Sequence, residues 1–405
     1  MDDRPRDPRL SPRDAAVRVA AILADGGHVA YFAGGCVRDR LIGHEPQDYD
    51  VATDARPDRV AGLFPGARYV GDAFGVVLVR MGGRTMEVAT FRADGPYHDG
   101  RRPHGVTFST PQADAQRRDF TVNGMFEDPR SGEVIDFVGG RADLRDRIIR
   151  AIGSAEERIA EDRLRTIRAV RFASRLDFSI DPATMAAIAS AADDLRAVSR
   201  ERVGTELRKM LSHSSRARAC SLLEESGLDA STLLEPHAAS GTSVIARLCP
   251  EAGWTTALAA WRSGRRASGT GNGDLRAALM LSSDEIEACL AAERCRVGLE
   301  EWLSMPLAAR IRAAALPGFA EALQLAEAEG ATESRQWVDE HTALAARPGG
   351  LAPAPLVTGS DLIQRGRRPS PEFKPILDAA YDRQLEGPIT DRDEALQALE
   401  RHLRA

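Results

Sequence analysis

The chain has 405 residues, 43% of them hydrophobic and 28% charged, and this length predicts two to four globular domains rather than one. No apolar run approaches the roughly 20 residues that a membrane span requires, and the charged segment 1–7 lacks the apolar core of a signal peptide. We therefore expect no membrane partner and a cytoplasmic location. The five cysteines form no CxxC pair, which argues against a zinc site or a disulfide framework.

The net charge of −6 is spread unevenly along the chain. Residues 154–218 hold 13 Lys and Arg against 10 Asp and Glu, which leaves −9 for the remainder. A basic patch on an acidic body is typical of a protein that contacts phosphate over only part of its surface.

Hydrophobic periodicity predicts a mixed α/β N-terminal part. In chain order we expect a helix over 11–27, a strand over 29–33, a helical turn over 37–42, a strand over 49–53 and a short helix over 57–64.

Two apolar runs, 74–81 and 85–91, then flank Gly82-Gly83, and this arrangement predicts a β-hairpin. The following stretch, 93–105, is charged, carries Gly and Pro, and shows no periodicity, so we expect a mobile loop.

From Gly153 onward the pattern is helical. Two interruptions are expected: a flexible surface loop over 264–273, and a linker over 348–355 that precedes a small C-terminal helical unit.

The strongest chemical signal is Gly34-Gly35 followed, thirteen residues later, by Asp48-Tyr49-Asp50. Glycines let a turn come close to a ligand, and the N–H groups of such a turn can hold phosphate. Carboxylates at i and i+2 of a strand point to the same side, as is needed to hold two Mg²⁺ ions beside a triphosphate. Together these features favour transfer of a nucleotide from a nucleoside triphosphate.

Two further residues extend this site. Arg38 follows the glycines closely, and its guanidinium can bridge phosphate oxygens. Glu87 is an acid between apolar strand residues. It is either a third carboxylate of the metal site or an exposed residue on the outer face of its strand.

The run 117–125 places Arg118 beside Asp119 and Asn123, which offers a phosphate contact and polar groups for a ribose. A solvated charge cluster is the alternative. Residues 161–175 have the composition of one helix, with Asp162 one turn before its first arginine on that face. The arginines that would line this face are Arg165, Arg168, Arg171 and Arg175. A carboxylate beside a guanidinium can read a base edge, whereas a ridge of surface ion pairs is the competing account.

Together and in this order, these elements resemble the class II tRNA nucleotidyltransferase/poly(A) polymerase family of the polymerase-β superfamily. The resemblance covers about residues 30–211, and segment 355–362 is similar to the tail of the bacterial CCA- and A-adding members. The chain departs from many members at Arg163, where they carry Pro, and at Gly124, where they carry Ala. The motifs that carry the resemblance are Gly34–Asp39, Asp48–Asp50, Arg117–Met125, Gly139–Gly153, Glu161–Phe172 and Glu201–Leu211.

The resemblance implies an α/β polymerase-β-like nucleotidyltransferase head followed by an all-α neck, body and tail. The expected domains are a head over 11–153, a neck that selects the base over 154–218, a body over 219–347 and a tail that contacts tRNA over 348–405. The segment 93–105 would be a flexible loop that helps the switch from C to A addition.

The resemblance also implies roles for individual residues. Asp48 and Asp50 would hold Mg²⁺, with Glu87 as a further catalytic acid. Asp162 and Arg165 would form the protein template that selects CTP or ATP. The residues expected at the nucleotide are Gly34, Gly35, Arg38, Arg118, Asp119, Asn123, Asp162, Arg165, Arg168 and Arg171.

The activity implied is template-independent addition of C, C and A to the tRNA 3′ end from CTP and ATP, with release of pyrophosphate. One Mg²⁺ would activate the RNA 3′-hydroxyl and the other would hold the triphosphate. The expected partner is tRNA, through its 3′ end and acceptor arm. Three alternatives share parts of these motifs: a poly(A) polymerase or an A-only or CC-only enzyme, a small-molecule nucleotidyltransferase, and an RNA-binding protein with a relic catalytic head.

Overall fold

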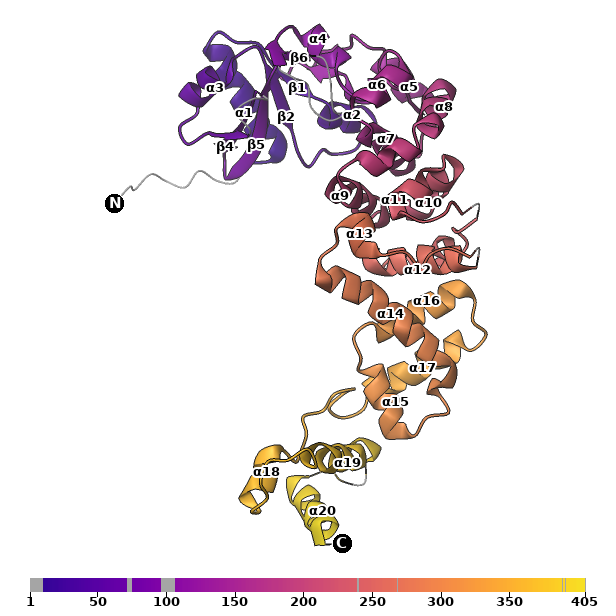
Figure 1. The fold of residues 1–405 in the computed structure, drawn as a ribbon. Coiled ribbons are helices and arrows are strands. Elements are labelled where there is room, and N and C mark those ends of the chain that lie inside the picture. Colours follow the sequence, from indigo (N-terminus) through magenta and orange to yellow (C-terminus); the bar gives the residue numbers. More distant parts are fainter. Residues whose placement is uncertain are drawn as a thin grey trace, which may run out of the picture. The chain divides into compact units, whose positions relative to one another are not determined.

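The computed structural model describes residues 10–70, 75–95, 106–238, 240–267, 269–387, 389 and 391–404. The chain forms two compact units. The colours of Figure 1 follow the residue numbers, so that the segments of each unit can be located along the ribbon. The first comprises Met1–His237 and Ala277–Leu279, and the second comprises Ala238–Arg276 and Met280–Ala405.

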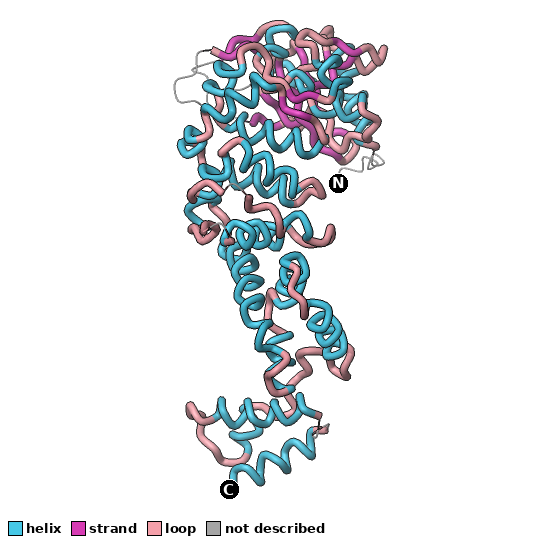
Figure 2. Tube along the Cα trace, turned by 90° about the vertical axis from the view of Figure 1, so that its right-hand side faces the viewer, coloured by secondary structure: helices cyan, strands magenta, loops and turns pink. Residues whose placement is uncertain are grey.

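All strands of the described chain lie in the first unit, where they appear in magenta in Figure 2. They are β1 (Ala30–Ala33), β2 (Asp50–Thr53), β3 (Arg68–Val70), β4 (Val76–Met81), β5 (Arg84–Thr90), β6 (Arg92–Asp94), β7 (Val106–Phe108), β8 (Phe126–Glu127), β9 (Val134–Ile135), β10 (Ile148–Ile149) and β11 (Ser179–Ile180). The main sheet has the order β3-β4-β5-β2-β1-β8-β9. Within its described strands every pair is antiparallel except β2–β5, which is parallel.

The helices of the first unit include the 3₁₀ turns η1 and η2. They are α1 (Pro12–Asp25), α2 (Gly35–Leu41), α3 (Pro57–Leu63), α4 (Pro111–Gln116), η1 (Thr121–Asn123), α5 (Gly140–Asp146), α6 (Ala155–Glu161), α7 (Leu164–Leu176), α8 (Pro182–Ser190), η2 (Asp193–Ala197), α9 (Arg200–Leu211), α10 (Arg216–Glu225) and α11 (Leu228–Leu233).

The second unit is helical in its described residues. Its elements are η3 (Ile245–Arg247), α12 (Trp254–Arg266), α13 (Leu275–Leu279, which ends in the first unit), α14 (Ser283–Trp302), α15 (Leu307–Ala314), α16 (Phe319–Glu329), α17 (Ser334–Ala345), α18 (Gly359–Gln364), α19 (Phe373–Glu386) and α20 (Arg392–Arg404). Buried aromatic residues such as Trp302 and Phe319, with ring centroids 4.9 Å apart, centre one core cluster. Among the helices described, none combines the length and the apolar character of a membrane span.

The hairpin of β4 and β5 shows how local sequence builds the sheet. Met81 pairs with Arg84, so Gly82-Gly83 forms a two-residue turn, and both glycines have positive φ (55° and 75°), as a type I′ turn requires. Along β5, Val88 is buried while Glu87 is exposed. The buried face packs against α1 and α3, which leaves the opposite face available for a site.

Most expected elements are confirmed within one to three residues. The helix over 11–27 is α1, which begins after Ser11, whose hydroxyl accepts the Asp14 N–H at 3.1 Å. The strands over 29–33 and 49–53 are β1 and β2. The stretch 348–355 contains neither helix nor strand, in agreement with the predicted linker.

The expected loop over 93–105 needs a correction. Ala93 and Asp94 belong to β6, which pairs with β7. Residues 96–105 lie outside the described residues, as does the segment 1–7, and the predictions made for them stay predictions.

The expected loop over 264–273 was wrong at its start, because α12 continues to Arg266. Arg265 is fully buried, with its guanidinium 5.4 Å from the ring centroid of Trp261. A Cβ on Gly264 would lie 2.1 Å from the carbonyl oxygen of Gly241. The Gly and Arg residues at 264–266 indicated a loop, but they form the buried last turn of α12.

The single helix expected over 161–175 was also wrong, because α6 ends at Glu161 and α7 begins at Leu164. Asp162 has an extended backbone (φ −146°, ψ 101°), and its Oδ1 accepts the Leu164 N–H at 3.1 Å. An aspartate that bonds to the backbone two residues onward competes with helix formation.

Candidate active site

A cavity of about 720 Å³ lies within the first unit, a size typical of ligand sites. Its walls come from the free face of the sheet, the glycine turn, the segment after α4, and the helices α7 and α9. The lining residues are Gly34, Gly35, Arg38, Asp48, Asp50, Val76, Glu87, Ala89, Arg117, Arg118, Asp119, Asn123, Asp162, Arg165, Arg168, Arg171, Phe172 and Lys209. The structure thus brings together every site residue predicted from sequence except Arg175, which lines a separate pocket.

The acids meet because of strand register. Val51 of β2 pairs with Val88 of parallel β5, which places Glu87 beside Asp50. Both side chains are exposed to the cavity, as is Asp48. Desolvation by the surrounding residues, together with the negative charges of Glu87 and Asp48, raises the pKa of Asp50 to about 6. The positive charge of Arg118 acts in the opposite direction.

These acids fit a divalent cation. Carboxylate oxygens are the ligands that Mg²⁺ prefers, and Asp48, Asp50 and Glu87 all line the cavity. In the part of the chain that the structure describes, no three acidic, His or Cys side chains form a complete ligand set. Mg²⁺ is commonly held by one or two carboxylates, with water and substrate phosphates as its other ligands.

Gly34 connects β1 to α2 in a conformation that other residues rarely adopt (φ 73°, ψ −124°). A Cβ at this position would lie 3.0 Å from Nη1 of Arg118. The glycine is therefore needed both for its backbone angles and for the close approach of an arginine of the cavity.

We expect Gly34→Ala to raise the KM for the nucleotide by about tenfold, because backbone strain of about 1–2 kcal/mol combines with displacement of Arg118. Steady-state kinetics with a varied nucleoside triphosphate, the ligand that the sequence motifs predict, measures this effect. Gly132→Ala is the matched control, since Gly132 has φ 74° and a Cβ at that position would have no neighbouring atom within 4 Å. We expect the two variants to lose similar thermal stability and only Gly34→Ala to change the KM. Equal changes in KM for Gly34→Ala and Gly132→Ala would refute this role of Gly34.

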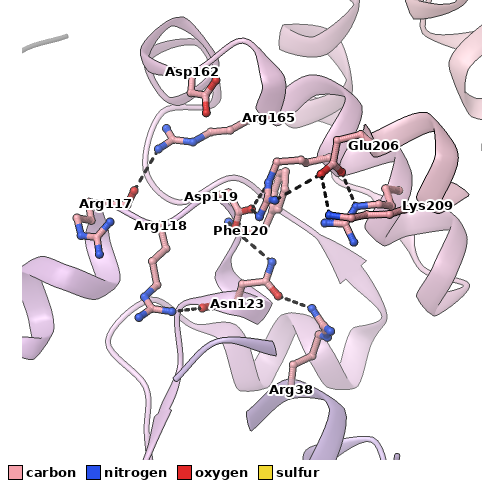
Figure 3. Close-up of polar contacts among 12 residues, drawn as sticks. Arg38, Arg117, Arg118, Asp119, Phe120, Asn123, Asp162, Arg165, Glu206 and Lys209 are labelled. Carbon is pink, nitrogen blue, oxygen red and sulfur yellow. Dashed lines mark hydrogen bonds and ion pairs between the residues drawn. The ribbon is translucent and has the colours of Figure 1, made fainter. Parts of the chain in front are cut away.

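Arg38 extends from α2 into the cavity and is almost fully buried. Its Nη1 donates to Oδ1 of Asn123 at 2.6 Å (Figure 3). Its Nε and Nη2 donate to Oδ1 of Asp39 at 2.8 and 2.6 Å. The guanidinium is therefore held in place before any ligand binds.

Asp114 is a buried residue that the sequence did not single out. It accepts hydrogen bonds from Arg117 (2.7 and 2.9 Å) and from Arg118 (3.0 and 3.2 Å). Burial would raise its pKa, but the two arginines lower it below its usual value. Its spacing of three and four residues from these arginines was the available signal, because such residues are neighbours on a helix.

Asp119 connects the head segment to α7 (Figure 3). Its Oδ1 accepts from Asn123 at 3.1 Å and from the Phe120 N–H at 2.8 Å, and its Oδ2 accepts from Arg168 at 2.6 and 3.0 Å. Burial acts to raise the pKa of Asp119, but Arg168 and these hydrogen bonds lower it to about 2.

This pKa predicts a loss of stability in acid. A carboxyl group with a lowered folded-state pKa stabilises the fold above its unfolded-state pKa, and this stabilisation is lost as the pH falls through the folded-state value. For Asp119 the window runs from about 4 down to about 2 and corresponds to about 2 kcal/mol. Urea unfolding from pH 7 to 2 should show this loss in the wild type and not in Asp119→Asn.

Asp193→Asn is the control for this prediction, because its side chain is 93% exposed. It should reproduce the wild-type pH dependence. A wild-type curve parallel to that of Asp119→Asn through this window would refute the prediction.

Asp162 and Arg165 are oriented by different partners. Oδ2 of Asp162 accepts from Nη2 of Arg202 at 2.8 Å. Arg165 is 8% exposed, and its Nη1 donates to Oε2 of Glu161 at 2.6 Å. Its Nη2 donates to the backbone oxygen of Arg117 at 3.2 Å (Figure 3). A carboxylate and a guanidinium are thus both fixed at one wall of the cavity.

Phe172 of α7 was missed from the sequence, although three guanidinium groups surround its ring. The distances from ring centroid to guanidinium carbon are 5.2 Å for Arg38, 5.3 Å for Arg168 and 4.1 Å for Arg171. Buried Glu206 of α9, also missed, accepts from Nε of Arg171 at 2.5 Å.

Comparison with known proteins agrees with this geometry. Residues 30–150 match the family described as "Poly A polymerase head domain", and residues 177–239 match "Probable RNA and SrmB- binding site of polymerase A". The chain is also similar to the solved CCA-adding enzyme of Bacillus stearothermophilus in complex with CTP, with 30% identity, 98% of each chain covered and a TM-score of 0.82. The chain belongs to the tRNA nucleotidyltransferase/poly(A) polymerase family.

Curated members of this family include the CCA-adding enzyme of Geobacillus stearothermophilus, 45% identical over 220 residues, and that of Bacillus subtilis, 42% identical over 214 residues. The matched stretch spans about half the length of these relatives, 54% in each case. The Thermotoga maritima CCA-adding enzyme complexed with tRNA shares the fold, with a TM-score of 0.70 at 21% identity.

Family membership confirms the resemblance inferred from the motifs and the α/β head followed by helices. Nucleotidyltransferases of this family generally use a divalent metal.

Proposed function

We propose that this chain adds C, C and A to the 3′ end of tRNA from CTP and ATP, without a nucleic-acid template and with release of pyrophosphate. The observation that carries the proposal is one cavity that combines acids of the sheet, a glycine turn and neck arginines. Support comes from the match over 98% of its length to a CCA-adding enzyme solved with CTP. The proposal includes Mg²⁺ as the metal, the tRNA 3′ end and acceptor arm as partner, and a cytoplasmic location.

In this proposal Asp48 and Asp50 hold Mg²⁺, with Glu87 as a supporting acid. Bound Mg²⁺ would promote ionisation of the RNA 3′-hydroxyl and neutralise charge on the leaving pyrophosphate. Gly34 and Gly35 let the triphosphate approach the backbone, and Arg38 and Arg118 orient it.

The remaining predicted contacts would hold the nucleoside. Asp119 and Asn123 would contact the ribose. Arg168 and Arg171 would support the part of the site that contains the template residues Asp162 and Arg165. With the nucleotide so oriented, the 3′ oxygen attacks the α-phosphorus in line, and the bond to the pyrophosphate breaks.

Base choice follows from the donor and acceptor pattern. Cytosine and adenine each present an amino donor next to a ring-nitrogen acceptor, whereas uracil and guanine present a carbonyl next to an N–H. Asp162 accepts only and Arg165 donates only, so the pair matches C and A. With U or G, the buried polar groups would be left unpaired, which is costly.

Product length tests the proposal. tRNA that lacks its 3′ end is incubated with each NTP alone and with CTP plus ATP. Three added nucleotides, C, C and A, support the proposed activity. A long A tract indicates a poly(A) polymerase, addition of only A or only CC indicates a partial enzyme, and transfer that ignores tRNA indicates a small-molecule enzyme. Absence of any transfer with intact metal binding indicates a relic head.

A further inference from the structure

A second pocket, of about 310 Å³, lies where the ends of α7 and α9 meet the start of α10. It adjoins the cavity of about 720 Å³ described above, which we call the nucleotide cavity. The walls of the second pocket are formed by Arg171, Arg175, Arg208, Lys209, His213 and several serines. None of the described residues that line it is acidic. Cations and hydroxyl groups without carboxylates are the chemistry that binds phosphate.

Helix polarity alone does not account for this pocket. Basic residues near the C-terminal ends of α7 and α9 favourably meet the negative ends of the helix dipoles. The interaction with the helix dipoles does not require the basic side chains to be close together. Here the basic residues of both helix ends line the same pocket. The carboxylate of Glu206 forms ion pairs with Arg171 and Lys209 and partly balances their charge. Arg175 makes no ion pair with any described residue.

His213 completes the wall as a hydrogen-bonding group. Its Nδ1 accepts the Ser215 N–H at 3.2 Å, so in the neutral ring the hydrogen is on Nε2. Burial and then Arg175 lower the pKa of His213, which favours this neutral form.

The position relative to the active site limits the ligand. Arg171 and Lys209 line both the pocket and the nucleotide cavity. In the proposed function, the triphosphate lies at the acids and the glycine turn, and the base lies at Asp162. The phosphates that remain to be held are those of the RNA strand whose 3′ end enters the cavity.

We propose that this pocket binds a backbone phosphodiester of the RNA strand close behind its reacting 3′ end. The inference rests on the proposed function and adds a specific phosphate subsite to it. Released pyrophosphate carries the same chemical group, so the experiment separates these two sources.

The first test compares Arg175→Ala with the control Arg145→Ala, whose side chain is 75% exposed on α5 and outside both cavities. Loss of one phosphate contact should raise the KM for tRNA by about tenfold, and should make the slope of log affinity against log salt shallower by roughly 0.7. The KM for CTP, and kcat at saturating tRNA, should not change. Because Arg175 is exposed, thermal unfolding should match that of the wild type.

The second test replaces single phosphodiesters near the RNA 3′ end with neutral methylphosphonates. The wild type should lose affinity at one linkage, and Arg175→Ala should show no additional loss there. Equal sensitivity of both proteins, or unchanged tRNA binding with weaker inhibition by pyrophosphate in the variant, overturns the inference. RNA affinity is measured without NTP, so failure of the pocket is separate from failure of nucleotide transfer, which is judged on the wild type alone.

Discussion

Asp50→Asn is expected to lower kcat for nucleotide addition by on the order of 100- to 1,000-fold, the cost of removing one preorganised electrostatic group from an active site. Asp50 starts β2 at the cavity, next to Asp48 and Glu87. An amide keeps the size of the side chain but removes the negative charge on which a divalent ion depends. Single-turnover transfer of C to truncated tRNA measures the chemical step, and electron paramagnetic resonance of added Mn²⁺ measures metal binding directly.

The variant should not be less stable than the wild type in metal-free buffer, because the substitution relieves repulsion among neighbouring acids. Asp58→Asn, at an exposed position in the first turn of α3, is the control of equal charge. Normal kcat together with normal Mn²⁺ binding in Asp50→Asn would show that this carboxylate does not serve a metal, and the catalytic proposal would fail.

Asp162→Ala is expected to reduce discrimination against UTP and GTP by about 5- to 160-fold, the range that corresponds to about 1–3 kcal/mol for a side-chain contact with a base edge. The reason is that Asp162 is the only acceptor of the proposed template pair. Transfer of CTP should slow by a smaller factor, since the proposed triphosphate contacts are made by other residues, Arg38 and Arg118. The measurement is kcat/KM for each of the four NTPs on the same truncated tRNA.

Glu157→Ala is a suitable comparison, because Glu157 is exposed on α6 and does not line the cavity. It should leave all four ratios unchanged. The template role of Asp162 is excluded if its variant slows all four nucleotides by one common factor. Loss of the Arg202 ion pair alone would lower stability without changing the ratios.

The parts of the fold that sequence predicted are those whose cause is local. Gly82-Gly83 between apolar runs requires a tight hairpin, and the structure has it. The double glycine at the start of α2 was likewise recognisable from spacing alone, as were Asp50 at the start of β2 and Asp48 just before that strand. The break between α6 and α7 at Asp162 could not be predicted, because residues 161–175 have a helical composition. The competing hydrogen bond from the Leu164 N–H depends on one conformation of the Asp162 side chain.

The site residues that sequence missed depend on distant pairings. Glu206 is a buried acid 35 positions from Arg171, and no periodicity connects the two. The position of Glu87 depended on the parallel pairing of β2 with β5, which are neighbours in the sheet although β3 and β4 separate them in the sequence. The two interpretations of Glu87 could not be separated before that register was known. Asp114 alone carried a local signal, through its spacing to Arg117 and Arg118.

The ring of Phe172 has a consequence for how this protein responds to its surroundings. Three guanidinium groups lie around it, and each of them is paired with one carboxylate. The pairs are Arg38–Asp39, Arg168–Asp119 and Arg171–Glu206. A nucleotide in the proposed site would bind the folded first unit and not the unfolded chain, so the first unit should become harder to unfold as NTP concentration rises. In a starved cell with depleted CTP and ATP, the same protein would be easier to unfold and to degrade, which would couple its abundance to the supply of its substrates.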